Sequence, residues 1–173
     1  MIMYTIYWNA VICSYYKELI GKTIYAFGDS IVYGHRGASN AFINQVAMKN
    51  SMTLNKKASN GAKIIVNSGK DILDQINGTS ASTTGPDFIL FEGCTNDAYG
   101  SAETDSFNAS GANLDMSDEA NIGTMQGSGA TEFDTSTFCG SFEKTIYTIK
   151  NKWPNSKVVF VTIHKSAARD WDI

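Results

Sequence analysis

Cysteine and proline are both scarce in this sequence, with 3 cysteines and 2 prolines among 173 residues. Cys13, Cys94 and Cys139 stand far apart and form no Cys-x-x-Cys pair, so their spacing predicts neither a disulfide framework nor a zinc site. The glycine-rich signatures GxGxxG and GxxxxGK[ST] are also absent, which argues against a nucleotide-binding domain. We expect no metal and no cofactor.

Charge is also sparse. Charged residues make up 18% of the chain, the formal net charge is −3, and no basic block occurs of the kind that tracks a phosphate backbone. Nucleic acid is therefore excluded as an expected partner.

Long apolar runs are missing as well. The opening stretch "MIMYTIYWNAVICSYY" is interrupted by Asn9 and Ser14, and it is too short for a membrane span of about 20 residues. It has no positive segment before it and no small-residue cleavage pattern, so it does not read as a signal peptide. The compartment, cytoplasmic or secreted, stays open.

The length suits one domain with a substantial core. We expect residues 22–173 to form that domain. Residues 1–21 read as an N-terminal extension or as the remnant of an upstream segment.

Strand and helix patterns alternate along the first half of the chain. Three stretches predict strands: "KTIYAFG", which is apolar, β-branched and aromatic, the shorter candidate "MTLNKKAS", and "PDFILFEG". The last is continuously apolar, as a strand buried on both faces should be. Between them, "SNAFINQVAMKN" predicts a helix capped by Ser39 or Asn40, and "KDILDQING" predicts a helix closed by Gly78.

The second half begins with residues 101–137, which are rich in Gly, Ser, Asn, Asp and Thr and predict a long loop, either functional or a plain surface insertion. "FCGSFEKTIYTIKNKW" then predicts a helix and "KVVFVTIH" a strand. This order predicts an α/β fold in three layers, with a parallel sheet between helices.

In such a sheet, ligands bind beyond the carboxyl ends of the strands. The residues that follow the predicted strands include Ser30, Gly61, Asn96 and His164. They offer a hydroxyl at a strand-to-helix turn, a backbone N–H without an intruding Cβ, a carboxamide donor and an imidazole. A nucleophile with several donors aimed at one point is what acyl transfer requires.

Three short blocks carry a family resemblance. "AFGDSIVYG", "SNGAKI" and "EGCTNDAYG" resemble, in order, the first three blocks of the GDSL, or SGNH, hydrolases. The resemblance implies a flavodoxin-like SGNH-hydrolase fold, with Ser30 as the nucleophile. It also implies an oxyanion hole formed by the Ser30 N–H, the Gly61 N–H and the Asn96 side chain.

Two departures from the family pattern stand out. Cys94 occupies the place where the third block has glycine, which reduces backbone freedom there. The fourth block, Asp-x-x-His, is absent, so no base is assigned; His35 and His164 are the only histidines, and His164 is expected at the correct sheet edge. We therefore expect a domain that lacks its last helix and strand, with an exposed sheet edge that favours a homodimer.

Each of these residues also has a purely structural interpretation. Ser30 by itself could be a helix N-cap, and Cys94 a small filler instead of a thiol nucleophile. Asp29 and Tyr33 are candidates for substrate contact, although Asp29 more naturally holds the turn. Tyr33, Tyr99 and Trp153 either line a pocket or pack.

The sequence thus supports two functions. The first is a serine ester hydrolase acting on small acyl esters, including acetylated carbohydrate, that is impaired by the missing base. The alternative is a catalytically silent carbohydrate-binding or interaction module on the same fold.

Overall fold

A parallel β-sheet organises the chain. In the computed structural model, which describes residues 18–34, 37–66, 71–82, 84–97 and 118–162, its strands lie in the order β2-β1-β3-β4, and each neighbouring pair is parallel. The strands are β1 (Thr23–Gly28), β2 (Thr53–Ala58), β3 (Phe88–Glu92) and β4 (Lys157–Val161).

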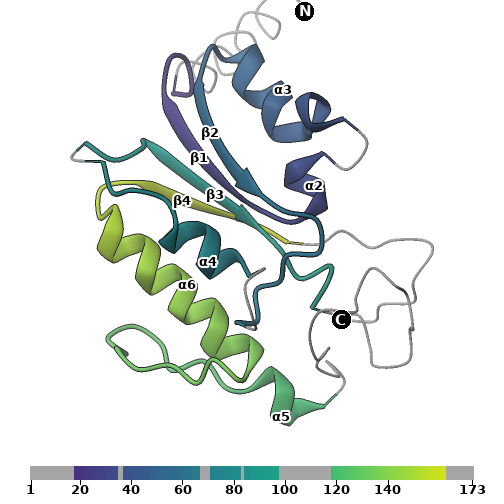
Figure 1. Ribbon diagram of the computed structural model, residues 1–173. Helices are drawn as coiled ribbons and strands as arrows, with labels where there is room; N and C mark the ends of the chain where they lie inside the picture. Colours follow the sequence, from purple (N-terminus) through teal and green to yellow (C-terminus); the bar gives the residue numbers. More distant parts are fainter. Residues whose placement is uncertain (1–17, 35–36, 67–70, 83, 98–117, 163–173) are drawn as a thin grey trace, which may run out of the picture.

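Helices cover both faces of this sheet (Figure 1). On one face lie α2 (Ser30–Tyr33) and α3 (Phe42–Lys49), joined through the 3₁₀ turn η1 (Ala38–Asn40). On the other lie α4 (Ile72–Asn77) and α6 (Phe138–Lys152), and the short α5 (Glu119–Ile122) precedes α6. The three-layer α/β/α arrangement predicted from the sequence is confirmed.

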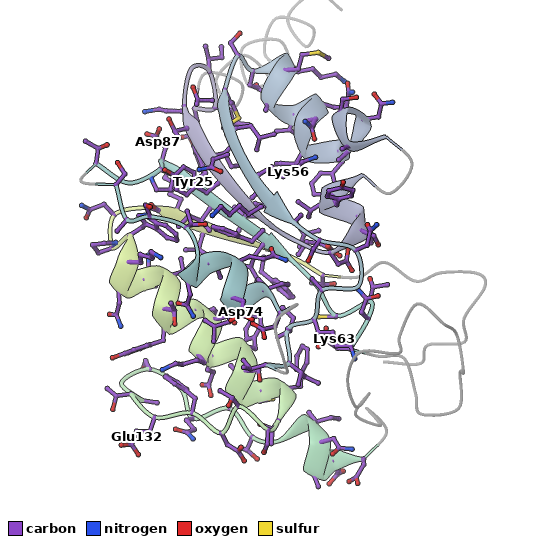
Figure 2. The ribbon with its side chains drawn as sticks, viewed as in Figure 1. Tyr25, Lys56, Lys63, Asp74, Asp87 and Glu132 are labelled. Carbon is purple, nitrogen blue, oxygen red and sulfur yellow. The ribbon has the colours of Figure 1, made fainter. Side chains whose placement is uncertain are left out.

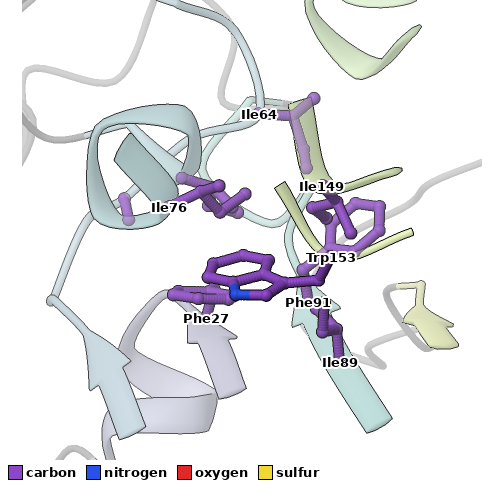
Figure 3. Close-up of a cluster of buried hydrophobic side chains, with 9 residues drawn as sticks. Phe27, Ile64, Ile76, Ile89, Phe91, Ile149 and Trp153 are labelled. Atoms are coloured by element: carbon purple, nitrogen blue, oxygen red, sulfur yellow. The ribbon is translucent and has the colours of Figure 1, made fainter. Parts of the chain in front are cut away.

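The larger core lies between the sheet and the helices α4 and α6 (Figure 3). Trp153, at the end of α6, stacks on Phe27 with ring centroids 6.1 Å apart and meets Tyr25 edge-on at 5.5 Å. Phe91 packs against Phe160 with centroids 4.8 Å apart. Trp153 is therefore a packing residue, the second of its two expected roles.

A second core lies under α2 and α3, where Ala26 and Leu90 from the sheet meet Val32 and Ile43. Because successive strand residues point to opposite faces, β1 and β3 supply both cores, which accounts for their continuously apolar sequences.

One local prediction, the cap of α3, needs correction. Neither Ser39 nor Asn40 caps α3: both lie in the 3₁₀ turn, and Ala41 holds the N-cap position without a side-chain hydrogen bond. The Ala41 methyl is buried in the second core, so packing decides the helix start. The expected long loop 101–137 includes α5 among its described residues, 118–137.

Strand β4 pairs only with β3 among the described residues, and its Val159 side chain is 43% exposed. An apolar sheet edge was expected, and this one is open within the described part of the chain. Homodimer formation through it stays a prediction, as do the domain bounds. In the portion the structure describes, no helix combines the length and apolarity that a bilayer crossing needs.

Truncating Phe91 should destabilise the protein strongly. Phe91 is fully buried between the sheet and α6, so Phe91→Ala should lower the free energy of unfolding by about 3–5 kcal/mol, measured by urea denaturation. The matched control is Phe42→Ala on α3, where the ring is 36% exposed and the loss should be much smaller. Equal losses would contradict this core assignment.

Candidate active site

Ser30 is the first residue of α2, at the point where β1 turns into the helix. The N-cap is the preceding residue, Asp29, whose Oδ1 accepts a hydrogen bond from the Ile31 N–H at 2.7 Å. The alternative in which Ser30 is the cap is therefore wrong. Ser30 is half-buried, and its hydroxyl bonds to no other described residue, so the side chain is not used to hold the turn.

Close packing fixes the position of this turn. A Cβ on Gly28 would lie 2.6 Å from Val32 Cγ2, so only glycine lets the strand end pass this close to α2. The Gln75 side chain of α4 holds the same residue from the other face. Its Oε1 accepts from the Gly28 N–H at 2.9 Å, and its Nε2 donates to the Gly28 carbonyl at 3.0 Å.

Gly61 follows β2 in a turn with a φ of +79°, a conformation that favours glycine. No atom lies within 4 Å of where its Cβ would be, so the space beside this backbone is open. The N–H groups of Ser30 and Gly61 donate to no acceptor within the described ranges. Both backbone donors among the three predicted for the oxyanion hole are thus uncommitted.

Asn96 brings the three strand ends together. Its Nδ2 donates to Asp29 Oδ2 at 3.0 Å, beyond β1, and to the Ala62 carbonyl at 2.8 Å, beyond β2. Asn96 itself lies beyond β3 and is only 9% exposed. Because an amide nitrogen carries two hydrogens, both donors of Asn96 have acceptors in this structure.

Asp97 ties the turn after β3 to the segment after β2. Its carboxylate accepts three backbone N–H groups: Ile64 at 3.0 Å, Ile65 at 2.8 Å and Cys94 at 3.1 Å. Burial raises the pKa of Asp97, and the three hydrogen bonds oppose that rise. Lys63, labelled in Figure 2, is buried on the segment after β2, next to Ile64. Burial lowers the pKa of its ammonium group.

Cys94 adopts a backbone conformation that normally requires glycine, with a φ of +86°. The expected loss of backbone freedom at Cys94 therefore falls on a position where glycine would be unstrained. Burial, and then the negative charge of Asp97, raise the pKa of the Cys94 thiol to about 12, so it is not a thiolate nucleophile. Its side chain packs against the larger core, as a small filler does.

A second buried acid, Glu92, adjoins Asp29 and was not singled out from the sequence. Asp29 is 0% exposed and Glu92 1%. Burial and then the charge of Asp29 raise the pKa of Glu92 to about 9, and burial raises that of Asp29. The sequence did contain one indication of this site: Glu92 is a charged residue at the end of the otherwise apolar strand β3. Because Asp29 is fully buried, we assign it to the turn instead of the substrate contact considered above.

Lys56, labelled in Figure 2, hydrogen-bonds to residues on either side of positions 35–36. Its Nζ donates to the carbonyls of Tyr33 at 2.9 Å and Ala38 at 2.6 Å and to Asn44 Oδ1 at 2.8 Å. Tyr33 is the last residue of α2, the helix that Ser30 begins, and its side chain is exposed; its contact with a substrate stays a prediction.

The predicted His164, and likewise His35 and Tyr99, lie outside the described residues. No cluster of three His, Cys, Asp or Glu side chains suited to a metal ion occurs in the described part.

No known family model and no curated protein sequence matches this chain. Several solved structures, however, are similar to it in fold. A GDSL-like lipase from Bacteroides ovatus is 16% identical with a TM-score of 0.59, over 84% of this chain and 74% of that one. A protein from Lactobacillus plantarum is 17% identical with a TM-score of 0.55, over 83% of this chain and 57% of that one.

A third similar structure is a family two carbohydrate esterase from Clostridium thermocellum, solved in complex with cellohexaose. It is 15% identical with a TM-score of 0.52, over 83% of this chain and 43% of that one. This chain thus spans between 43% and 74% of these neighbours. At such identities the likeness establishes the fold alone, and the expected α/β fold with a parallel sheet between helices is confirmed.

Glycine at position 94 should relieve the strained backbone. We expect Cys94→Gly to be more stable than Cys94→Ala by about 1 kcal/mol, because both lose the thiol but only glycine adopts a φ of +86° without a steric penalty. Urea denaturation of the two variants measures the difference. A Cys94→Ala variant as stable as Cys94→Gly would show that the turn is unstrained.

Proposed function

We propose that this chain carries a serine ester hydrolase site of the SGNH type, acting on small acyl esters such as acetylated carbohydrate. The observation that carries the proposal is the junction at Asn96, which joins the turn of Ser30 to the residue after Gly61. The free N–H groups of Ser30 and Gly61 support it, since an oxyanion hole needs uncommitted donors.

In the proposed reaction, Ser30 Oγ attacks the ester carbonyl carbon, and the serine proton passes to a base. The carbonyl oxygen becomes an oxyanion, held by the N–H groups of Ser30 and Gly61. Its collapse breaks the bond to the alcohol, which leaves with a proton, and the acyl group stays on Ser30. Water then hydrolyses the acyl-enzyme by the same steps.

Asn96 would contribute to this oxyanion hole by exchanging a partner. Its amide hydrogens already contact Asp29 and the neutral Ala62 carbonyl. A full negative charge on the substrate oxygen is a stronger acceptor than a neutral carbonyl, so the oxyanion would displace Ala62. Asn96 therefore serves two purposes in the proposal: it holds the strand ends before attack and donates during it.

The base limits the rate. No Asp-x-x-His occurs in the sequence, and His164, which the sequence predicts at the sheet edge, lies outside the described residues. We therefore expect slow turnover that an added base accelerates.

A catalytically silent carbohydrate-binding module is the second candidate. Two observations favour it: the missing Asp-x-x-His and the fully committed Asn96 amide. Such a module would bind an acetylated oligosaccharide with no contribution from the Ser30 hydroxyl to any reaction.

Replacing Ser30 should abolish ester hydrolysis. We expect the chain to hydrolyse p-nitrophenyl acetate faster than Ser30→Ala, because only the hydroxyl forms an acyl-enzyme. Millimolar imidazole should widen the gap by supplying the missing base. The Ser30→Ala chain also measures the reaction of imidazole alone, and Ser39→Ala, an exposed serine, controls for substitution at the surface.

Identical rates for the chain and Ser30→Ala, with and without imidazole, would reject the hydrolase and leave the binding module. Titration of Ser30→Ala with an acetylated oligosaccharide then tests that second candidate, which fails if no binding is detected.

Removing the Asn96 amide should lower the rate of ester hydrolysis to that of the Ser30→Ala chain. The reason is that one oxyanion donor contributes about 10²–10³-fold to turnover. The variant is Asn96→Ala, measured in imidazole, with circular dichroism to confirm folding. Asn77→Ala, at the exposed end of α4, is the control. A folded Asn96→Ala chain with undiminished rate would remove Asn96 from the oxyanion hole.

A further inference from the structure

Glu92 is a buried acid that the proposed reaction does not use. It ends β3, one residue beyond the register pair Phe27 and Phe91, and it is 1% exposed. Its backbone carbonyl would lie 3.1 Å from a Cβ on Gly28, so β1 and β3 run tightly side by side at this point. This packing places the Glu92 carboxyl next to Asp29, where the two acids act on each other.

The two carboxyl groups have unequal surroundings. Asp29 accepts the Ile31 N–H on one oxygen and the Asn96 amide on the other. Neither oxygen of Glu92 accepts a hydrogen bond from any residue that the structure describes. A buried carboxylate without donors is very costly, whereas a carboxylic acid has a hydrogen of its own to donate. The surroundings thus favour an ionised Asp29 and a neutral Glu92.

We propose that Glu92 is a positioning residue that donates its carboxylic acid hydrogen to Asp29 and so holds Asp29 against both the Ser30 turn and Asn96. Its effect on catalysis rests on the proposed hydrolase function, whereas its protonation does not. With Glu92 neutral, Asp29 has three donors and keeps one orientation. With Glu92 ionised, two adjacent buried carboxylates repel each other, and the contacts to Ile31 and Asn96 weaken.

The charged and titratable groups that face Glu92 are Asp29, Asp97 and Cys94, and Lys63 acts on Asp97. The folded chain keeps the Glu92 proton up to a pKa of about 9, whereas an unfolded glutamate releases it near 4.5. Between these two values the folded state binds the extra proton. Stability contributed by this group is therefore complete below the lower value and falls as the pH rises toward the upper one.

Urea denaturation across this range tests the pair without any need for activity. The experiment compares the Ser30→Ala chain, called the parent, with the same chain carrying Glu92→Gln in addition. Glutamine still donates an N–H to Asp29 but never ionises. We expect the urea midpoint of the parent to fall relative to Glu92→Gln from about pH 5 to about pH 9 and then to level off. Glu132→Gln, which removes an exposed carboxyl (Figure 2), sets the baseline. Parallel midpoints would overturn the proposal.

A measurement on the unmodified chain covers the case in which Glu92→Gln does not fold. Carbon-13 NMR of the glutamate carboxyl groups should show one that is still protonated at pH 7. Complete ionisation of all glutamates at that pH would overturn the proposal.

Activity then tests the positioning role. Glu92→Met keeps the length of the side chain but cannot donate, and we expect it to lower the Ser30-dependent rate in imidazole by about tenfold or more, with Glu92→Gln restoring most of it. Equal rates for folded Glu92→Met and Glu92→Gln would overturn this role. If the chain shows no Ser30-dependent rate at all, the hydrolase proposal fails, and the denaturation and NMR results still decide the protonation of Glu92.

Discussion

The amide of Asn96 is the contact on which the arrangement of this site depends. It donates to Asp29 beyond β1 and to Ala62 beyond β2, and it stands beyond β3 itself. Neighbouring strands of a parallel sheet end at one edge, but their turns are free to diverge beyond it. One short, buried side chain with two donors holds three of these turns together, and the Ser30 and Gly61 N–H groups are presented from two of them.

Burial of acids is the electrostatic cost of this construction. Asp29, Glu92 and Asp97 all lie almost fully buried at the same end of the sheet. Asp97 is offset by three backbone N–H groups and Asp29 by one backbone N–H and the Asn96 amide. Glu92 receives no such donor within the described residues, so a proton is the physically reasonable compensation. Asp29 and Asp97 thus stabilise the turns by accepting hydrogen bonds from donors that would otherwise be unpaired.

Much of the fold could be predicted from the sequence, because the apolar strands β1 and β3 and the amphipathic helices are separated by clear turn residues. The contacts of Asn96 with Asp29 and Ala62, which join the ends of three strands, agree with the placement of the candidate residues at strand ends. The Glu92 pair could not be predicted in this way, since it depends on the register of β1 against β3 and on how closely Gly28 passes β3. The start of α3 was missed for a similar reason, because burial of Ala41 outweighs the capping preference of Ser39 and Asn40.

The central claim is that the junction at Asn96 presents Ser30 as a nucleophile. Covalent labelling tests it most directly: the chain is incubated with diethyl p-nitrophenyl phosphate and imidazole and then digested for peptide mass spectrometry. The account predicts a diethylphosphoryl group on Ser30, with p-nitrophenolate released as the serine oxygen bonds to phosphorus, and much weaker labelling of Ser30 in the Asn96→Ala variant. Labelling spread over exposed serines, or none on Ser30, would contradict it.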